Sequence, residues 1–256
     1  MNAIYLSLLL SVIGISDAAG AEASPVQIIL VGDSTMAPET GYGNAFCARL
    51  HAPAHCLNMA KGGRSSASYR SEGSWTAVQN QLRQKIDGST TYVLIQFGHN
   101  DQPGKPGRST DLATEYPQNL TRYVHDVQEA GAIPVLVTPL TRRNFERGML
   151  QNSLQAWAEA MRQVASAEHV ALIDLNADSA ALVQKIGPDE SDTLAMAPRG
   201  ATSNNETVKR GDAFRGFDHT HLGAKGAAVF SAMVEQELLA QFPSMAVNFN
   251  DVHSTP

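Results

Sequence analysis

Short runs of apolar residues alternate along this chain with longer stretches in which apolar residues recur every three or four positions. A short, nearly unbroken apolar run rich in β-branched residues is typical of a strand buried on both faces of a parallel sheet. Four runs fit this pattern and a fifth fits it more weakly; they are Val26–Val31, Tyr92–Phe97, Ile133–Thr138, Val170–Asp174 and, as the weaker candidate, His55–Asn58.

Three stretches between and after these runs have helical spacing. Leu112–Ala130 ends at Gly131, a suitable C-terminal cap, Asn152–Ala167 carries apolar residues at helical spacing, and Gly223–Phe242 is an Ala-rich amphipathic stretch. Strands that alternate with helices predict an α/β fold with a parallel sheet covered on both faces. Residues 187–216 are polar and poorly periodic, and we predict a long surface loop there.

The first 23 residues resemble a signal peptide. The apolar run Ile4–Ile15 is too short to span a bilayer, and the sites Ala19-Gly20-Ala21 and Ala21-Glu22-Ala23 suit cleavage. No Lys or Arg precedes the run, so a membrane-anchored N-terminus is the alternative. We expect a secreted or periplasmic protein whose residues 24–256 form one domain.

Composition excludes several classes of protein. The 256 residues are 43% apolar and 17% charged with a net charge of −6, which excludes a disordered chain and a charged coiled coil. No polybasic run is present, so we expect no nucleic-acid partner, and we expect neither stable membrane association nor an oligomer. Two cysteines are too few for a thiolate zinc site; in an exported protein Cys47 and Cys56 favour a disulfide over two buried thiols.

Polar clusters follow the predicted strands. In open parallel sheets, ligands bind beyond the carboxyl ends of the strands, so these clusters should meet at one edge. The clusters are Asp33-Ser34, Lys61–Ser66, Gly98–Asp101 and Thr138–Arg143, joined by Asp218–His221 before the last helix.

Ser34 is the first candidate for chemistry. It follows a buried strand in Gly32-Asp33-Ser34-Thr35, where a helix starting next would favour an attacking alkoxide through its dipole. The alternative is that Asp33 or Ser34 only caps that helix. With a separation of three residues, Asp218 and His221 can point the same way, so that His221 is the base for Ser34 and Asp218 orients its ring.

Two other interpretations of that segment stay open. His219 could be the base instead, or Asp218, His219 and His221 could bind a metal ion. A rival nucleophile is Ser65, because Gly63-Arg64-Ser65-Ser66-Ala67 nearly matches the G-x-S-x-G elbow of another hydrolase fold.

A serine nucleophile also needs donors for the oxyanion of its tetrahedral intermediate. The backbone N–H of Ser34 is one candidate, and that of Gly63 is a second because Gly62-Gly63 allows close approach of the main chain. The side-chain amide of Asn100 is a third, with an ordinary turn asparagine as the alternative.

Taken together, these motifs resemble the four blocks of the SGNH (GDSL) hydrolases, in their order. The longer strings resemble the rhamnogalacturonan acetylesterase branch of the carbohydrate esterases, which act on pectin and sometimes on xylan. The resemblance covers residues 26–239, and its strings are Gly63-Arg64-Ser65-Ser66, Ile95–Asp101, Thr138–Arg143 and Phe217–His221.

The resemblance implies a three-layer α/β/α sandwich around a five-stranded parallel sheet, of flavodoxin-like type, with no metal or organic cofactor. It implies Ser34, Asp218 and His221 as the catalytic triad, and Ser34, Gly63 and Asn100 as the oxyanion hole. Two departures concern the polysaccharide recognised: Ser74 stands where relatives often carry arginine, and the loop over residues 187–216 is long.

Four residues are candidates for substrate contacts. Arg142 and Arg143 could bind a uronate carboxylate or form a surface ion pair, and Trp75 could stack on a sugar or pack in the core. His99 could contact the substrate or only shape its loop. The sequence favours a secreted carbohydrate O-acetylesterase; the alternatives are an esterase or lysophospholipase acting on lipid acyl esters, and a non-catalytic carbohydrate-binding relative.

Overall fold

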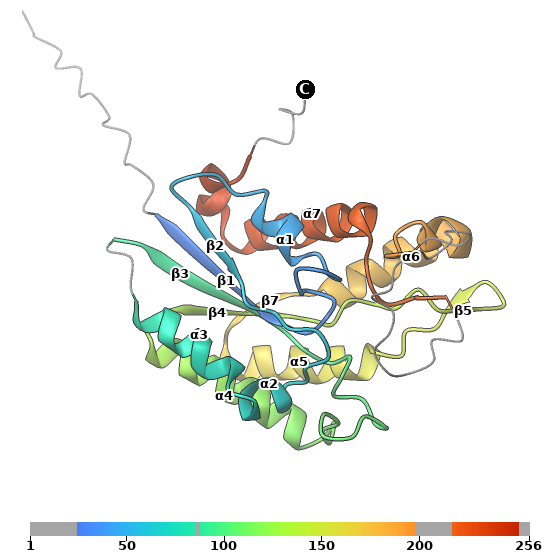
Figure 1. The fold of residues 1–256 in the computed structure, drawn as a ribbon, viewed down its shortest axis with the longest axis horizontal. Coiled ribbons are helices and arrows are strands. Elements are labelled where there is room, and N and C mark those ends of the chain that lie inside the picture. Colours follow the sequence, from blue (N-terminus) through green and yellow to red (C-terminus); the bar gives the residue numbers. More distant parts are fainter. Residues whose placement is uncertain (1–24, 85–87, 198–216, 251–256) are drawn as a thin grey trace, which may run out of the picture.

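The fold is built around one parallel five-stranded sheet (Figure 1). A computed structural model describes residues 25–84, 88–197 and 217–250. The strand order is β2-β1-β3-β4-β7. The bounds are β1 Val26–Gly32, β2 His55–Asn58, β3 Thr90–Gln96, β4 Ile133–Val137 and β7 Ala171–Ile173. All five predicted strands are confirmed to within two residues at each end.

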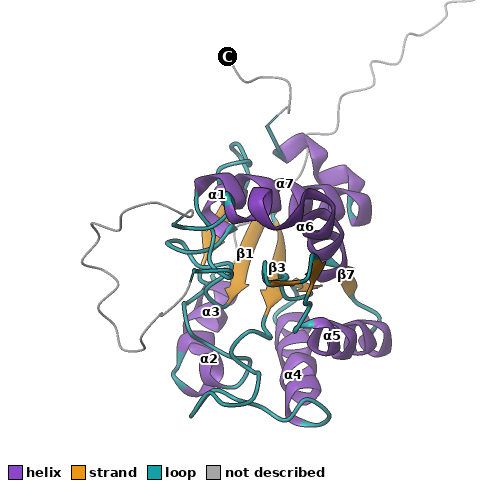
Figure 2. Ribbon diagram, turned by 90° about the vertical axis from the view of Figure 1, so that its right-hand side faces the viewer, coloured by secondary structure: helices purple, strands orange, loops and turns teal. Residues whose placement is uncertain are grey.

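Helices cover both faces of the sheet (Figures 1 and 2). One face packs against α1, α6 and α7, and the other against α3, α4 and α5. The helices are α1 Gly43–Cys47, α2 Ser68–Ser71, α3 Ser74–Arg83, α4 Glu115–Glu129, α5 Gln155–Glu168, α6 Leu175–Asp192 and α7 Ala224–Gln241, with a 3₁₀ helix at Pro243–Asn248. The predicted three-layer α/β/α architecture is confirmed.

The central strand β1 shows why the sheet needs cover on both sides. All seven of its residues are buried. Ile28 and Leu30 point into the core beneath α1 and α7, whereas Ile29 and Val31 point into the core beneath α3 and α4. Because side chains alternate along a strand, a continuous apolar run is what a strand between two cores requires.

The predicted loop over residues 187–216 is wrong in its first part. Helix α6 continues to Asp192 across a kink at Gly187, whose φ of 78° lies in the left-handed region. Gly187 and Pro188 break the helical pattern in the sequence, but the helix resumes directly after them. Residues 198–216 lie outside the described residues, as do the predicted signal segment 1–23 and its cleavage sites.

Two further features lie at the edges of the fold. The predicted disulfide between Cys47 and Cys56 is confirmed, and it joins the end of α1 to β2. β5 (Phe145–Glu146) and β6 (Met149–Leu150) form a small antiparallel hairpin after β4. Among the helices of residues 25–84, 88–197 and 217–250, none combines the length and apolarity needed to cross a bilayer.

Candidate active site

Ser34 lies in the turn directly after β1. Gly32 is required before it, because a Cβ at that position would lie 2.8 Å from the backbone oxygen of Gln96. The Asp33 carboxylate accepts a hydrogen bond from the Thr35 N–H at 2.9 Å and closes the turn. The predicted helix after Ser34 is wrong, since turns fill the chain up to α1 at Gly43, and no helix dipole acts on Ser34.

A continuous set of hydrogen bonds links Ser34 to the segment before α7. His221 Nε2 lies 2.9 Å from Ser34 Oγ, and His221 Nδ1 lies 2.9 Å from Asp218 Oδ2. The other oxygen of Asp218 accepts the backbone N–H groups of Thr220 and His221 at 2.9 and 3.0 Å. The arrangement can pass a proton from the Ser34 hydroxyl to the imidazole while the carboxylate fixes the ring.

Hydrogen bonds determine the charge of Asp218. Partial burial alone would raise the pKa of its carboxyl group, but hydrogen bonds from the His221 ring and from the N–H groups of His221 and Thr220 hold that pKa well below its usual range. Asp218 is therefore a carboxylate at neutral pH, which favours the His221 tautomer with a proton on Nδ1.

Arg143 fixes the backbone of residues 217–221 through hydrogen bonds. Its side chain is 1% exposed and donates to the backbone oxygens of Asp218 at 3.1 Å and His221 at 2.8 Å. Its own N–H donates to the oxygen of His219 at 2.9 Å. The guanidinium is buried among backbone carbonyls, so Arg143 does not form a surface ion pair, and these contacts favour a structural role over a substrate contact.

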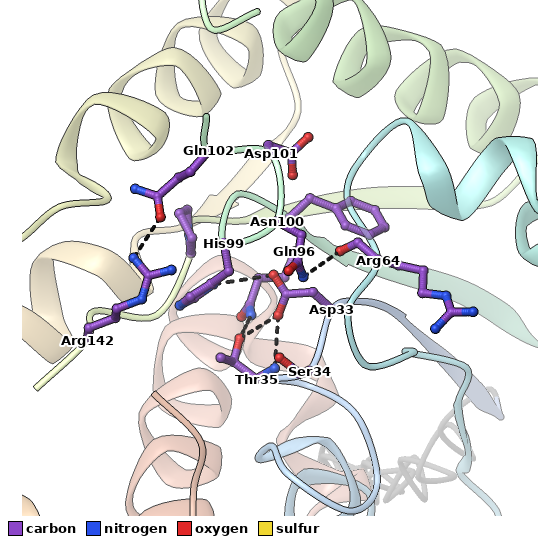
Figure 3. Close-up of polar contacts among 12 residues, drawn as sticks. Asp33, Ser34, Thr35, Arg64, Gln96, His99, Asn100, Asp101, Gln102 and Arg142 are labelled. Carbon is purple, nitrogen blue, oxygen red and sulfur yellow. Dashed lines mark hydrogen bonds and ion pairs between the residues drawn. The ribbon is translucent and has the colours of Figure 1, made fainter. Parts of the chain in front are cut away.

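Two loops beside Ser34 carry the remaining candidate donors. A Cβ at Gly62 would lie 3.8 Å from the Cβ of Ser34, so the Gly62-Gly63 loop passes next to the hydroxyl, and Gly63 has a φ of 77° that favours glycine. Asn100 is 5% exposed, and its Nδ2 donates to the backbone oxygen of Arg64 at 3.0 Å (Figure 3). The structure thus brings Ser34, Gly63 and Asn100 to one side of the strand ends.

A buried polar network joins Asp33 and Thr35, the residues on either side of Ser34, to β3 and the loop after it (Figure 3). His99 Nδ1 lies 3.3 Å from Asp33 Oδ2, and Gln96 Nε2 donates to Thr35 Oγ1 at 2.6 Å. Burial lowers the pKa of His99, with Asp33 opposing; burial would raise the pKa of Asp33, but His99 and Thr35 hold it below its usual value. His99 is 2% exposed and lies against Asp33, which favours the alternative that it shapes its loop over a substrate contact.

Of the three other candidates, the structure buries Trp75 and Ser65 and leaves Arg142 partly exposed. Trp75 is 3% exposed, packs edge-to-face on Tyr123 and donates to Asp126, so it belongs to the core and its predicted sugar contact is wrong. Ser65 is fully buried and hydrogen-bonded within its own turn, which excludes it as a nucleophile. Arg142 is partly exposed and donates to Gln102 and Ser153.

The alternatives for the His219 segment are resolved by ring direction. His219 lies 3.6 Å from Asp192 and packs against Phe217, whereas His221 faces Ser34. The two imidazoles therefore diverge and do not form a metal site together with Asp218. Within the described ranges, no group of three His, Cys, Asp or Glu side chains is arranged to hold a metal ion.

Sequence reasoning missed two neighbours of this site. Lys105 Nζ lies 3.3 Å from Asn100 Oδ1, and Arg108 Nη1 lies 3.4 Å from the backbone oxygen of Gly63. Both come from the long connection between β3 and α4. Their place in the sequence could have indicated this, because both follow directly after the polar cluster Gly98–Asp101, which carries Asn100.

Comparisons with known proteins identify relatives of this chain. The chain is 35% identical to the rhamnogalacturonan acetylesterase RhgT of Bacillus subtilis over 220 residues, which cover 83% of this chain and 89% of that protein. It is 28% identical to a rhamnogalacturonan acetylesterase of Emericella nidulans, with 88% of each chain covered. The crystal structure of an acetyl xylan esterase, AlAXEase, superposes with a TM-score of 0.59 at 18% identity, over 82% of this chain and 98% of that one.

The family assignment rests on a match over most of the chain. Residues 30–229 match the model of the GDSL-like lipase/acylhydrolase family. This range begins inside β1 and ends inside α7. It therefore includes most of the sheet, the loops that carry Gly63 and Asn100, and the segment with His221. The chain belongs to the GDSL-like lipase/acylhydrolase family and is a carboxylic ester hydrolase.

Proposed function

We propose that this protein is an exported carbohydrate O-acetylesterase that removes acetyl groups from plant cell-wall polysaccharide, with Ser34 as nucleophile. The observation that carries the proposal is the continuous hydrogen-bond path from Ser34 through His221 to Asp218, with distances of 2.9 Å at both steps. A base within hydrogen-bond reach of a hydroxyl, and a carboxylate orienting that base, is the arrangement that activates serine.

The reaction would proceed through an acyl-enzyme. Ser34 Oγ attacks the acetyl carbonyl carbon while His221 Nε2 takes the hydroxyl proton, and the negative charge on the carbonyl oxygen is held by the N–H groups of Ser34, Gly63 and Asn100. His221 then gives the proton to the departing sugar oxygen as the C–O bond breaks. Water, deprotonated by His221, repeats the attack and releases acetate and free Ser34.

Two observations support a sugar as the leaving group rather than a lipid acyl ester. Both curated relatives described above are rhamnogalacturonan acetylesterases by name, which favours rhamnogalacturonan or pectin, with xylan a further possibility from the structural neighbour. A pocket also opens beside the segment with His221, and four of its six lining residues are polar or charged. The lining residues are Arg143, Asn144, Phe145, Pro188, Asp192 and His219.

Export is part of the proposal. The apolar N-terminal segment 1–23 supports it from the sequence. The disulfide between Cys47 and Cys56 supports it from the structure, since disulfides persist in oxidising compartments.

The test is acetate release from acetylated pectin, rhamnogalacturonan and xylan by the wild type and by Ser34→Ala. We expect the wild type to release acetate from at least one polymer and Ser34→Ala to be slower by about 10⁶-fold. Ser65→Ala is the matched control, because Ser65 is buried and its side chain bonds to Ser68 rather than to Ser34 or His221; it should keep wild-type turnover. Near-normal turnover by Ser34→Ala would overturn the mechanism, and cleavage of long-chain acyl esters only would move the assignment to lipid substrates.

A further inference from the structure

Two of the proposed oxyanion donors belong to amide groups whose oxygen atom is held by a cationic side chain. The N–H of Gly63 is part of the peptide whose carbonyl oxygen is that of Gly62, and Arg64 Nη1 donates to this oxygen at 2.8 Å. The Nδ2 of Asn100 is part of a side-chain amide whose Oδ1 lies 3.3 Å from the ammonium of Lys105.

The Asn100 amide is fixed at both ends. One N–H of its Nδ2 donates to the backbone oxygen of Arg64 at 3.0 Å, while Lys105 donates to its Oδ1. A flipped amide would place its oxygen against a carbonyl oxygen and its NH₂ against an ammonium group, and both contacts would be repulsive. The remaining N–H of Nδ2 is therefore presented in one orientation.

A positive charge on the oxygen of an amide also strengthens its N–H groups as donors. Hydrogen bonds with an ionised partner are stronger than neutral ones, and bonds in a chain polarise one another, most of all where water is excluded. Asn100 is 5% exposed and Ser34 is 8% exposed, so little water reaches the site to weaken this polarisation.

We propose that Lys105 and Arg64 are positioning residues that orient and polarise the Asn100 amide and the Gly62-Gly63 peptide for binding of the oxyanion. This inference rests on the proposed function, because it requires those two amides to meet the oxyanion. Neither cation touches the reacting atoms; each acts through the amide whose oxygen it holds.

The two cations should contribute unequally. Lys105 is partly buried, forms no ion pair within the described part of the chain and contacts Asn100 Oδ1; burial, Arg142 and Arg108 lower its pKa, with Asp33 and Asp101 opposing. The Arg64 side chain is 38% exposed and is paired with Glu72 at 2.8 Å. Solvent and this carboxylate screen its charge, so we expect the larger effect from Lys105.

The first experiment measures kcat and KM for a neutral small ester, 4-nitrophenyl acetate, with Lys105→Met, Arg64→Met and Arg108→Met. Loss of a whole oxyanion donor costs about 10²–10³ in kcat, so loss of the group that orients it should cost about 10-fold for Lys105→Met, with KM nearly unchanged. Arg64→Met should lower kcat by less.

Arg108→Met is the matched control. Its guanidinium lies in the same region, but the oxygen it contacts, that of Gly63, belongs to the following peptide, whose N–H is not a proposed donor. It should therefore lower kcat less than Lys105→Met does. An equal loss of kcat in Arg108→Met would overturn the proposal in favour of a general positive field, and Lys105→Arg should recover activity if the contact itself matters.

A double-mutant cycle with Asn100→Ala separates this inference from the proposed function. If Lys105 acts through Asn100, Lys105→Met should lower kcat in the wild type but not in the Asn100→Ala background. Independent losses in the two backgrounds would overturn the role of Lys105 while leaving the oxyanion hole intact. An unchanged kcat in Asn100→Ala itself would instead overturn the assignment of Asn100 as a donor. Thermal unfolding of each variant checks that the fold is retained.

Discussion

In the proposed mechanism Asp218 sets the tautomer of His221, because its carboxylate contacts Nδ1 at 2.9 Å and leaves Nε2 to accept the Ser34 proton. In Asp218→Asn the side-chain amide can donate to Nδ1 and favour the wrong tautomer. We expect kcat for a small acetyl ester to fall by about 10⁴-fold. Steady-state kinetics on purified protein measures this, with circular dichroism to show that the fold persists.

The matched control for Asp218→Asn is Glu168→Gln. Glu168 also pairs with a histidine, His125, at 2.8 Å, but this pair lies on α4 and α5 away from Ser34. Its kcat should equal that of the wild type. A loss below about tenfold in Asp218→Asn would contradict the orienting role, since such a loss is far smaller than a wrong tautomer causes.

Arg143 shows what a local motif cannot predict. Its position in Thr141-Arg142-Arg143 gives no sign that one arginine is partly exposed and the next is 1% exposed, because burial depends on the distant segment 217–221. Arg143→Met would leave the backbone oxygens of Asp218 and His221 without a donor. We expect the free energy of unfolding to fall by about 1–3 kcal/mol, together with kcat.

Urea unfolding with Arg143→Met and Arg122→Met tests that expectation. Arg122 is exposed on α4, so its substitution should leave the free energy of unfolding unchanged. Equal stability of the two variants would show that the carbonyls find other donors and that Arg143 does not hold the segment.

At the scale of elements, the sequence predicts those whose pattern is long or unbroken. β1 and β3 are continuous apolar runs, and α4 and α5 repeat their apolar residues at helical spacing, so each was located to within about three residues. α1 and α2 have only five and four residues, too few for a period to show. α6 was hidden by Gly187-Pro188, where a left-handed glycine interrupts a helix that then resumes.

The disulfide is the clearest test at this scale. It joins α1 to the edge strand β2 across nine residues of chain. Closing a loop of that length lowers the entropy of the unfolded chain, which raises the free energy of unfolding by about 2–3 kcal/mol. We expect the Cys47→Ala/Cys56→Ala double variant to be less stable by this amount in chemical denaturation. The reductant-treated wild type should match the variant; equal stability of oxidised and reduced protein would contradict the prediction.

At the scale of the whole molecule, strand order explains why the meeting of the polar loops can be predicted from the sequence, although the contacts around them cannot. β1 and β3 are adjacent at the centre of the sheet, so the turns after them, with Ser34 and Asn100, must meet at its carboxyl edge. For Trp75 and His99 the sequence leaves a substrate contact and a buried role open, because a sequence pattern does not tell which polar or aromatic side chains turn inward; both are buried in the structure. Lys105 belongs to no motif, because the role we propose for it depends on a contact with Asn100 that appears only in the structure.

Asp101 connects its own loop after β3 to the loop that carries Ser66, and it makes the free energy of unfolding depend on pH. It is fully buried and accepts hydrogen bonds from the N–H of Ser66 at 3.0 Å and from Thr110 Oγ1 at 3.1 Å. Burial raises its pKa to about 6, despite these hydrogen bonds, from an ordinary value of 3.8. Its contribution to stability is therefore fully present below pH 3.8 and is lost as pH rises through 6.

Asp101→Asn isolates this contribution, because asparagine does not titrate. Since the pKa of Asp101 is raised on folding, the stability of the wild type relative to Asp101→Asn should increase as pH falls from 7 to 4, by up to about 3 kcal/mol. Urea unfolding at several pH values measures this difference. Asp111→Asn is the control, because Asp111 lies in the same connection and hydrogen bonds from Thr114 lower its pKa. The difference in free energy of unfolding between the wild type and Asp111→Asn should therefore not change over this pH range. A flat difference for Asp101→Asn as well would mean that Asp101 stays ionised in the folded protein, and that Ser66 and Thr110 fully replace its hydration.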